Sequence, residues 1–150
     1  VARQGDTISE TESISLTDLV GKCWATVDTD DATIEILNEM TLQGDPDRLR
    51  HVFENLFRNA VEHGGPAVTV RVGCHNEKGI YVEDDGPGIP VEKREEVFEP
   101  GHSSARAGTG FGLTIVKRIV GAHGWELSVT DGTDGGARFE FEMAEQRGFV

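Results

Sequence analysis

The chain has 150 residues, 37% of them apolar, which is enough for one globular domain with its own core. Its 27 acidic residues outnumber its 14 basic ones and give a formal net charge of −13, so nucleic acid and anionic membranes are poor partners. The apolar runs fall far short of the roughly 20 residues that span a bilayer, and the first residues do not resemble a signal segment. We therefore expect a soluble domain.

Lysine and cysteine usage both indicate an intracellular setting. Four lysines accompany ten arginines, and an acidic, lysine-poor surface suits a salt-rich cytosol, where ions screen the repulsion between like charges. Cys23 and Cys74 belong to no CxxC pair, so neither fits the usual metal and redox patterns. We expect both thiols to be buried and reduced in a cytoplasmic protein.

The chain is predicted to begin with a linker and a helix. Residues 1–13 lack apolar periodicity and are rich in acids, Ser and Thr, so we place a linker over 1–14 and the domain over 15–150. The linker would enter from an upstream segment. The run SLTDLVGKCWATV then has helical spacing, with Ser15 as its N-cap.

A second helix is predicted over residues 46–63, after two short alternating strands at 32–37 and 40–44. Asp45 is a good N-cap, Pro46 suits the first helical position, and two glycines follow the last turn. The apolar positions recur at helical spacing and form one stripe: Leu49, Val52, Phe53, Leu56 and Ala60.

The remaining elements are strand pairs and helices. In chain order we predict strands over 67–74 and 79–84, a short helix over 91–98, an aperiodic loop, a helix over 111–124, and strands over 125–131 and 136–143. Strands paired mostly as hairpins, with helices gathered on one face, predict an α+β fold. We expect a two-layer sandwich with a mixed, mostly antiparallel sheet.

Asn55 and Asn59 lie four residues apart on the second helix, on a stripe separate from its apolar face. Asparagine is a mediocre helix former, so the presence of two asparagines inside this helix needs an explanation. Two interpretations are open: ordinary polar residues on a solvated face, or amide oxygens that face a polyphosphate and its metal. Mg²⁺ prefers hard oxygen ligands and shares phosphate oxygens, so a neutral amide can complete its shell.

The segment DDGPGIP, residues 84–90, follows a predicted strand directly. A Gly-Pro-Gly turn is common by itself. Asp84 at the end of the strand could, however, accept a hydrogen bond from an exocyclic amino group, while Gly86 and Gly88 would let a flat ring approach the backbone. Together these features describe an adenine pocket.

The segment GTGFGL, residues 108–113, opens the third helix. Glycines at alternate positions let backbone amides converge, and the helix N-terminus beside them attracts anionic phosphate. It is not a P-loop, because Thr114 occupies the position of the P-loop lysine. Alone this motif is a weak signal.

The three motifs in this order resemble the GHKL ATPase superfamily, and most closely the catalytic ATP-binding (HATPase_c) domain of sensor histidine kinases. FENLFRNAVEH is similar to the N box of that family, DDGPGIP to its first glycine box, EEVFEPG to its F box and GTGFGLTIVKRIVGAHG to its second glycine box. The resemblance covers about residues 15–143. It implies a Bergerat-type ATP-binding fold with ATP and Mg²⁺ as ligands.

The resemblance also implies roles for particular residues. Asn59 would coordinate Mg²⁺, Asn55 would support Asn59 at the metal or contact phosphate, and Asp84 would recognise the adenine amino group. Residues 99–107 would form a mobile lid, with Phe98 holding the base of the lid in the core. The full predicted ATP-binding set is Asn55, Asn59, His63, Asp84, Gly86, Gly88, Ile89, Arg106, Gly108, Thr109, Gly110, Gly112 and Leu113.

Two positions depart from the family pattern. Glu62 stands where a lysine often contacts phosphate, which leaves phosphate neutralisation to Mg²⁺ and to Arg106, His63 or His102. Ala137 stands where a Ser or Thr often joins a water bridge to adenine, so adenine recognition would depend more on Asp84.

The residue one helical turn before Asn59 bears on the reaction class. ATP-hydrolysing branches of the superfamily carry a glutamate there to orient water, whereas this chain has Asn55. Glu54 is rotated by about 100° around the helix axis and should point elsewhere. We therefore expect phosphoryl transfer to another nucleophile rather than hydrolysis.

None of the five histidines fits the acceptor motif of a histidine kinase, so we expect the acceptor upstream or on another chain. The expected partners are ATP, a histidine-containing dimerisation domain and a response regulator receiver domain, in a homodimeric protein that is cytoplasmic or membrane-anchored. Two alternatives remain open: a protein serine kinase of the anti-sigma type, and a non-catalytic adenine-nucleotide sensor.

Overall fold

The computed structural model describes residues 11–27, 31–64, 67–76, 79–94, 96–98, 112–133 and 135–143. In this part of the chain the main sheet has the strand order β2 (Thr33–Ile36), β4 (Thr69–Asn76), β5 (Gly79–Asp84), β7 (Ala137–Glu142) and β6 (Glu126–Asp131). The β2–β4 pair is parallel and the other pairs are antiparallel.

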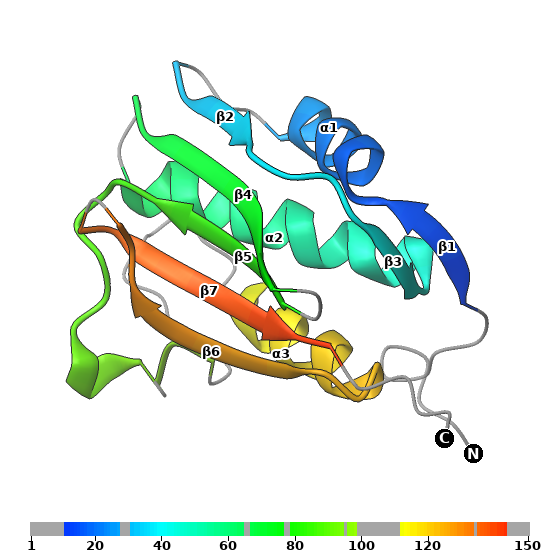
Figure 1. The fold of residues 1–150 in the computed structure, drawn as a ribbon. Helices are drawn as coiled ribbons and strands as arrows, with labels where there is room; N and C mark the ends of the chain where they lie inside the picture. Colours follow the sequence, from blue (N-terminus) through cyan, green and yellow to red (C-terminus); the bar gives the residue numbers. More distant parts are fainter. Residues whose placement is uncertain are drawn as a thin grey trace.

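The α-helices of the described residues lie on one face of this sheet, as Figure 1 shows. They are α1 (Leu16–Thr26), α2 (Pro46–Gly64) and α3 (Gly112–Ala122). The predicted two-layer α+β sandwich with a mixed, mostly antiparallel sheet is confirmed. None of the three combines the length and apolar character that a membrane crossing requires.

A second, two-stranded sheet lies beside the first and was not predicted. Strand β1 (Glu12–Ser15) pairs antiparallel with β3 (Thr41–Gly44), so Glu12, Ser13 and Ile14 form a strand although they were predicted to belong to a linker. Residues 1–10 lie outside the described residues. β1 leads directly into α1 and thereby places the start of that helix against β3.

The N-terminus of α2 is capped as predicted. Asp45 Oδ1 accepts the backbone N–H groups of Asp47 (3.1 Å) and Arg48 (3.3 Å). The N–H of Asp45 itself donates to His123 Nε2 at 3.1 Å, and His123 Nδ1 lies 2.9 Å from the carbonyl oxygen of Ile119. Because Nε2 accepts, the proton of the neutral ring is on Nδ1. His123 was expected inside the helix; it lies just after α3 and joins α3 to α2.

The core lies between α2 and the sheet. The predicted stripe of α2 is buried throughout, and Phe53 packs against Phe57 and against Phe141 of β7, each pair with ring centroids 6.0 Å apart. Burial of a side chain of this size contributes about 1.5–3 kcal/mol. The apolar stripe therefore holds α2 on the sheet and leaves its other side for polar residues.

The two cysteines differ in their surroundings. Both are free thiols, but Cys23 is buried in the core whereas Cys74 is partly exposed, so the expectation that both are buried is wrong for Cys74. Burial raises the pKa of the Cys23 thiol to about 12, with the nearby carboxylate of Glu54 acting in the same direction. Cys23 is accordingly a packing residue and a poor nucleophile.

The segment after the first glycine motif forms two 3₁₀ turns, Val91–Lys93 and Glu96–Phe98, in place of the predicted short α-helix. Lys93 N–H donates to the Pro90 carbonyl (2.9 Å), which closes a turn of three residues rather than four.

Glu39, in the loop between β2 and β3, holds the first turn of α1. Its carboxylate accepts the Ser15 hydroxyl (2.7 Å) and both the N–H (2.9 Å) and the hydroxyl (2.7 Å) of Thr17. These bonds, the Ser15 bond first among them, lower the pKa of Glu39 from 4.5 to about 2. The Ser15 hydroxyl oxygen in turn accepts the N–H of Asp18, which confirms Ser15 as the N-cap.

We predict that Glu39→Gln lowers the melting temperature at neutral pH. A carboxyl whose pKa is lowered in the folded state stabilises the fold above its unfolded pKa and loses that contribution as the pH falls. The wild type should therefore lose stability between pH 4.5 and about 2 more steeply than the variant. Thermal melts across this range measure it. Glu12→Gln, on exposed β1, is the control, and parallel curves for wild type and Glu39→Gln would contradict the assignment.

Candidate functional site

Asp84 ends strand β5 and uses one of its two carboxylate oxygens to organise the surrounding backbone. Oδ1 accepts the N–H of Gly86 at 2.9 Å and the N–H of Ala137 at 3.3 Å. Among the described residues no donor reaches Oδ2. Burial raises the pKa of this carboxyl, while the two N–H bonds act in the opposite direction. The free oxygen can accept a hydrogen bond from a purine amino group.

The turn between β6 and β7 packs directly against Asp84. Gly132 N–H donates to the Gly136 carbonyl (2.6 Å), and Gly135 N–H donates to the Gly132 carbonyl (3.1 Å). A Cβ added at Gly136 would overlap the carbonyl oxygen and the carboxylate of Asp84. The β6–β7 turn therefore packs directly against Asp84, and glycine is needed at position 136 for this close approach.

The first glycine motif is held by its neighbours in the protein. A Cβ at Gly86 would lie 2.5 Å from Gly64 Cα, at the end of α2. Gly88 has a φ of +81°, which favours glycine, and a Cβ there would lie 2.8 Å from the Gly135 carbonyl oxygen. Gly86 and Gly88 were predicted to let a ligand ring approach the backbone. In the structure they allow α2 and the β6–β7 turn to approach the motif.

Helix α2 contributes the asparagine pair. Asn55 is engaged within the helix, because its Nδ2 donates to the His51 carbonyl (2.7 Å) and its Oδ1 lies 3.4 Å from Arg58 Nη1. Asn59 is partly exposed and contacts no hydrogen-bonding side chain that the structure describes. Of the two, Asn59 is the one available as a ligand. His63 is exposed in the last turn of the same helix.

Glu54 points away from this group, as predicted from its rotation around the helix. Its Oε2 accepts the Thr26 hydroxyl of α1 (3.0 Å) and lies 3.9 Å from Arg50 Nε. Glu54 therefore belongs to the contact between α1 and α2. It is not placed to orient a water molecule beside Asn59.

The start of α3 is tied to the 3₁₀ turn that contains Phe98. The Thr114 hydroxyl donates to the Phe98 carbonyl (2.7 Å), and the Phe98 ring packs edge-on against Phe139 with centroids 6.2 Å apart. Gly112 begins α3 and Leu113, partly buried, lies in its first turn. The predicted lid and the remaining predicted phosphate-binding residues lie outside the described residues: 99–107, Arg106, Gly108, Thr109 and Gly110.

Glu83 supports this site and was missed in the sequence analysis. Its side chain is only 4% exposed, on the sheet face opposite the helices, and its Oε1 accepts the N–H (3.0 Å) and the hydroxyl (3.3 Å) of Thr133. Arg138 Nη1 lies 3.4 Å from Oε1 and Arg71 Nη1 lies 3.7 Å from Oε2. Consecutive residues of β5 thus hold the β6–β7 turn, Glu83 through Thr133 and Asp84 through Ala137.

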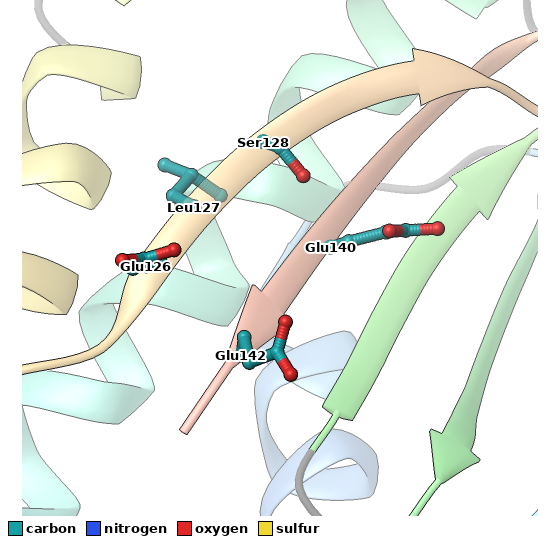
Figure 2. A pocket seen from close by; sticks show the side chains of 5 residues that line it. All are labelled: Glu126, Leu127, Ser128, Glu140 and Glu142. Carbon is teal, nitrogen blue, oxygen red and sulfur yellow. The ribbon is translucent and has the colours of Figure 1, made fainter. Parts of the chain in front are cut away.

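A shallow pocket of about 70 Å³ lies elsewhere on the sheet, over β6 and β7 (Figure 2). Three carboxylates line it, from Glu126, Glu140 and Glu142, together with Leu127 and Ser128. Glu140 is paired with Arg138 at 2.7 Å, and Glu126 lies directly opposite Glu142 in the strand register. None of these residues belongs to the predicted nucleotide site.

The side-chain oxygens of Asp84 and Asn59 fit a nucleotide bound together with Mg²⁺. Asp84 supplies an acceptor for a base amino group, and Asn59 supplies one neutral, hard oxygen. In the described part of the chain no three His, Cys, Asp or Glu side chains are grouped to hold a metal. A single neutral amide oxygen is a ligand of the kind that Mg²⁺ accepts beside phosphate oxygens and water.

The chain is similar in sequence to known sensor kinases. Residues 44–147 match the family described as histidine kinase-, DNA gyrase B- and HSP90-like ATPase. The chain is 39% identical over 102 residues to the sensor histidine kinase ZraS of Escherichia coli O157:H7, which covers 65% of this chain and 22% of ZraS. It is 35% identical over 107 residues to the adaptive-response sensory kinase SasA of Trichormus variabilis, covering 66% and 27%. The chain thus spans about a quarter of the length of these relatives.

Solved structures with the same fold cover nearly the whole chain. The mycobacterial sensor histidine kinase MprB aligns with a TM-score of 0.78 at 27% identity, over 89% of this chain and 96% of that one. The catalytic domain of the histidine kinase ThkA aligns with a TM-score of 0.76 at 26% identity, over 90% and 95%. The fold therefore matches that of the ThkA catalytic domain over 90% of this chain.

We predict that Gly136→Ala destabilises the protein by about 1–3 kcal/mol, because the added methyl group overlaps Asp84. Gly21→Ala is the matched control. It places the same methyl group in the middle of α1, where nothing lies within 4 Å, and should stabilise the protein by about 0.5–1 kcal/mol. Urea unfolding of both variants measures the difference. A Gly136→Ala protein as stable as the wild type would contradict the close packing of the turn on Asp84.

Proposed function

The chain belongs to the histidine kinase-, DNA gyrase B- and HSP90-like ATPase family, and on this premise we propose that it is the ATP-binding catalytic domain of a sensor histidine kinase. In this role it binds Mg-ATP and donates the γ-phosphoryl group to a histidine on a separate dimerisation domain. The observation that carries the proposal is the Asp84 carboxylate, with one oxygen held by two backbone N–H groups and the other left for a base. Relatives named as sensor kinases over this same region support it.

The proposed binding mode divides the nucleotide among three parts of the chain. Asp84 Oδ2 accepts the adenine amino group, and Gly86, Gly88 and Ile89 surround the base. Asn59 ligates Mg²⁺, which would neutralise charge on the phosphate oxygens, and Asn55 supports Asn59 from the preceding turn. The remaining predicted residues bind the phosphates: His63, Arg106, Gly108, Thr109, Gly110, Gly112 and Leu113.

Phosphoryl transfer is proposed in preference to hydrolysis because of where Glu54 lies and because an asparagine stands one helical turn before Asn59. Glu54 is engaged with Thr26 and Arg50, and the residue one turn before Asn59 is Asn55. Neither residue therefore supplies a carboxylate aimed at water beside the metal. In the transfer step an imidazole nitrogen attacks the γ-phosphorus, the bond to the bridging oxygen breaks, and ADP leaves with that oxygen.

The proposal also assigns the wider setting of the domain. The phosphohistidine would pass its phosphoryl group to the receiver domain of a response regulator. The histidine-bearing segment and a second copy of the protein would together form a homodimeric kinase. Because the domain uses ATP, we place it on the cytoplasmic side of the cell.

We predict that Asp84→Asn weakens ATP binding about 100-fold. Since Oδ1 is held by two N–H donors, an Asn at this position must turn its NH₂ group toward the base, where it meets the adenine amino group donor to donor. Calorimetric titration with Mg-ATP measures the loss. Asp85→Asn is the control, because Asp85 accepts the Thr69 N–H (2.9 Å) through an oxygen that asparagine keeps. Equal affinities for the wild type and Asp84→Asn would refute the base pocket.

The raised pKa of Asp84 adds a pH dependence to this binding. Recognition of the amino group needs the unprotonated oxygen, so ATP affinity should begin to fall above 3.8, the ordinary pKa of an aspartate, as the solution is acidified. In Asp84→Asn this dependence should disappear. Titrations across acidic pH, with folding followed by circular dichroism, separate loss of binding from loss of structure.

We predict that Asn59→Ala abolishes transfer of label from γ-labelled ATP to the histidine of the dimerisation domain in the full-length kinase. The reason is loss of the metal ligand, so raised Mg²⁺ should restore part of the activity. Labelled protein and labelled inorganic phosphate are measured in the same reaction. Release of inorganic phosphate without any labelled protein in the wild type would favour hydrolysis and overturn the transfer step.

A further inference from the structure

Arg94 lies outside all four sequence motifs and makes two directed contacts. Its Nε donates to the Ile89 carbonyl at 2.9 Å, and its Nη2 donates to Asp131 Oδ1 at 2.5 Å. The Arg94 side chain is 19% exposed, whereas that of Asp131 is 79% exposed. The planar guanidinium thus spans from the first glycine motif to the end of β6.

The Ile89 carbonyl lies in a stretch of chain outside the helices and strands, although the Ile89 side chain packs against the core. Gly88 precedes it with a positive φ, and Pro90 follows it and has no N–H to donate. Residues 88–90 belong to no helix or strand. Of the donors that the structure describes, the Arg94 guanidinium is the one that reaches the Ile89 oxygen.

Asp131, the second partner of Arg94, also lies beside the proposed base site. Asp131 is the last residue of β6, immediately before the turn that packs on Asp84. Through Arg94, the loop that carries Ile89 and the turn that packs on Asp84 are therefore joined directly. These two segments flank the proposed position of the base.

We propose that Arg94 is a positioning residue for the nucleotide base: with Asp131 as its partner, it fixes Ile89 relative to Asp84 and so sets the width of the base pocket. This inference rests on the proposed nucleotide site. Its consequence is specificity, because a loosened Ile89 loop would hold adenine less well and discriminate less between adenine and other purines.

The exposure of Asp131 distinguishes this role from a purely structural one. An ion pair with a largely exposed partner adds little to folding stability, so loss of the pair should barely change the melting temperature. The orientation of the guanidinium depends on both contacts together. A lysine would keep the positive charge but offers no fork that reaches two acceptors in fixed geometry.

The test is a calorimetric titration of the 150-residue chain with Mg-ATP and Mg-GTP. We expect Arg94→Met and Arg94→Lys each to weaken ATP binding about 10-fold, the loss of one well-placed hydrogen bond to a charged group, with little change for GTP. Asp131→Asn should cost about 3-fold, and the Arg94→Met/Asp131→Asn double variant should match Arg94→Met, because the two residues act as a unit. Lys93→Met, which removes an exposed charge from the neighbouring position, is the control and should bind as the wild type.

Several outcomes would overturn the inference. Wild-type ATP affinity in Arg94→Met would do so, as would wild-type ATP affinity in Arg94→Lys, which would reduce the role of Arg94 to its charge. A loss of binding that follows a matching fall in melting temperature would make Arg94 a structural residue. If Arg94→Met does not fold, Asp131→Asn carries the test.

Asp84→Asn in the same series separates the two proposals. Unchanged ATP binding in Asp84→Asn refutes the nucleotide site. ATP binding that is lost in Asp84→Asn but kept in Arg94→Met refutes only the role of Arg94.

Discussion

One carboxylate oxygen organises the site. Asp84 Oδ1 accepts backbone N–H groups from the loop that follows β5 and from the first residue of β7, so a single atom joins two segments far apart in the sequence. This arrangement fixes the carboxylate in one orientation and leaves the other oxygen pointing to a defined place. The cost is that burial disfavours the ionised form, and the two N–H bonds offset part of that cost. Recognition of a base depends on that balance.

The rest of the fold can be understood as support for this carboxylate. Because side chains alternate along a strand, Glu83 and Asp84 project to opposite faces of β5, yet both hold the β6–β7 turn. Helix α2 meets the same region from the other side, where Gly64 packs against Gly86. Its apolar stripe binds it to the sheet while Asn59 stays available on the polar side. Backbone contacts, rather than long flexible side chains, thus define most of the site.

The sequence was sufficient to predict features that depend on local chemistry. Ser15 and Asp45 cap their helices as predicted, because a cap needs only the residues of one turn. The glycine motifs could also be recognised, because each is a short run of neighbouring residues, and their order along the chain identified the family. Strand β1 was missed because its four residues carry no clear period and become a strand only by pairing with β3. Glu83 and Arg94 were missed because Thr133 and Asp131 approach them only once the sheet has formed, and no spacing in the sequence signals such a contact.

The carboxylates above β6 and β7 bear on how copies of this domain behave at high concentration. Strand β6 has its one described partner in β7, so it forms an outer border of the sheet, where an incoming strand from a neighbour could dock. The opposed pair Glu126 and Glu142 would repel an identical border carrying the same charges. Open-ended edge-to-edge pairing of sheets into fibres is thereby disfavoured, and when salt shields these charges the protein should become more prone to aggregate along β6.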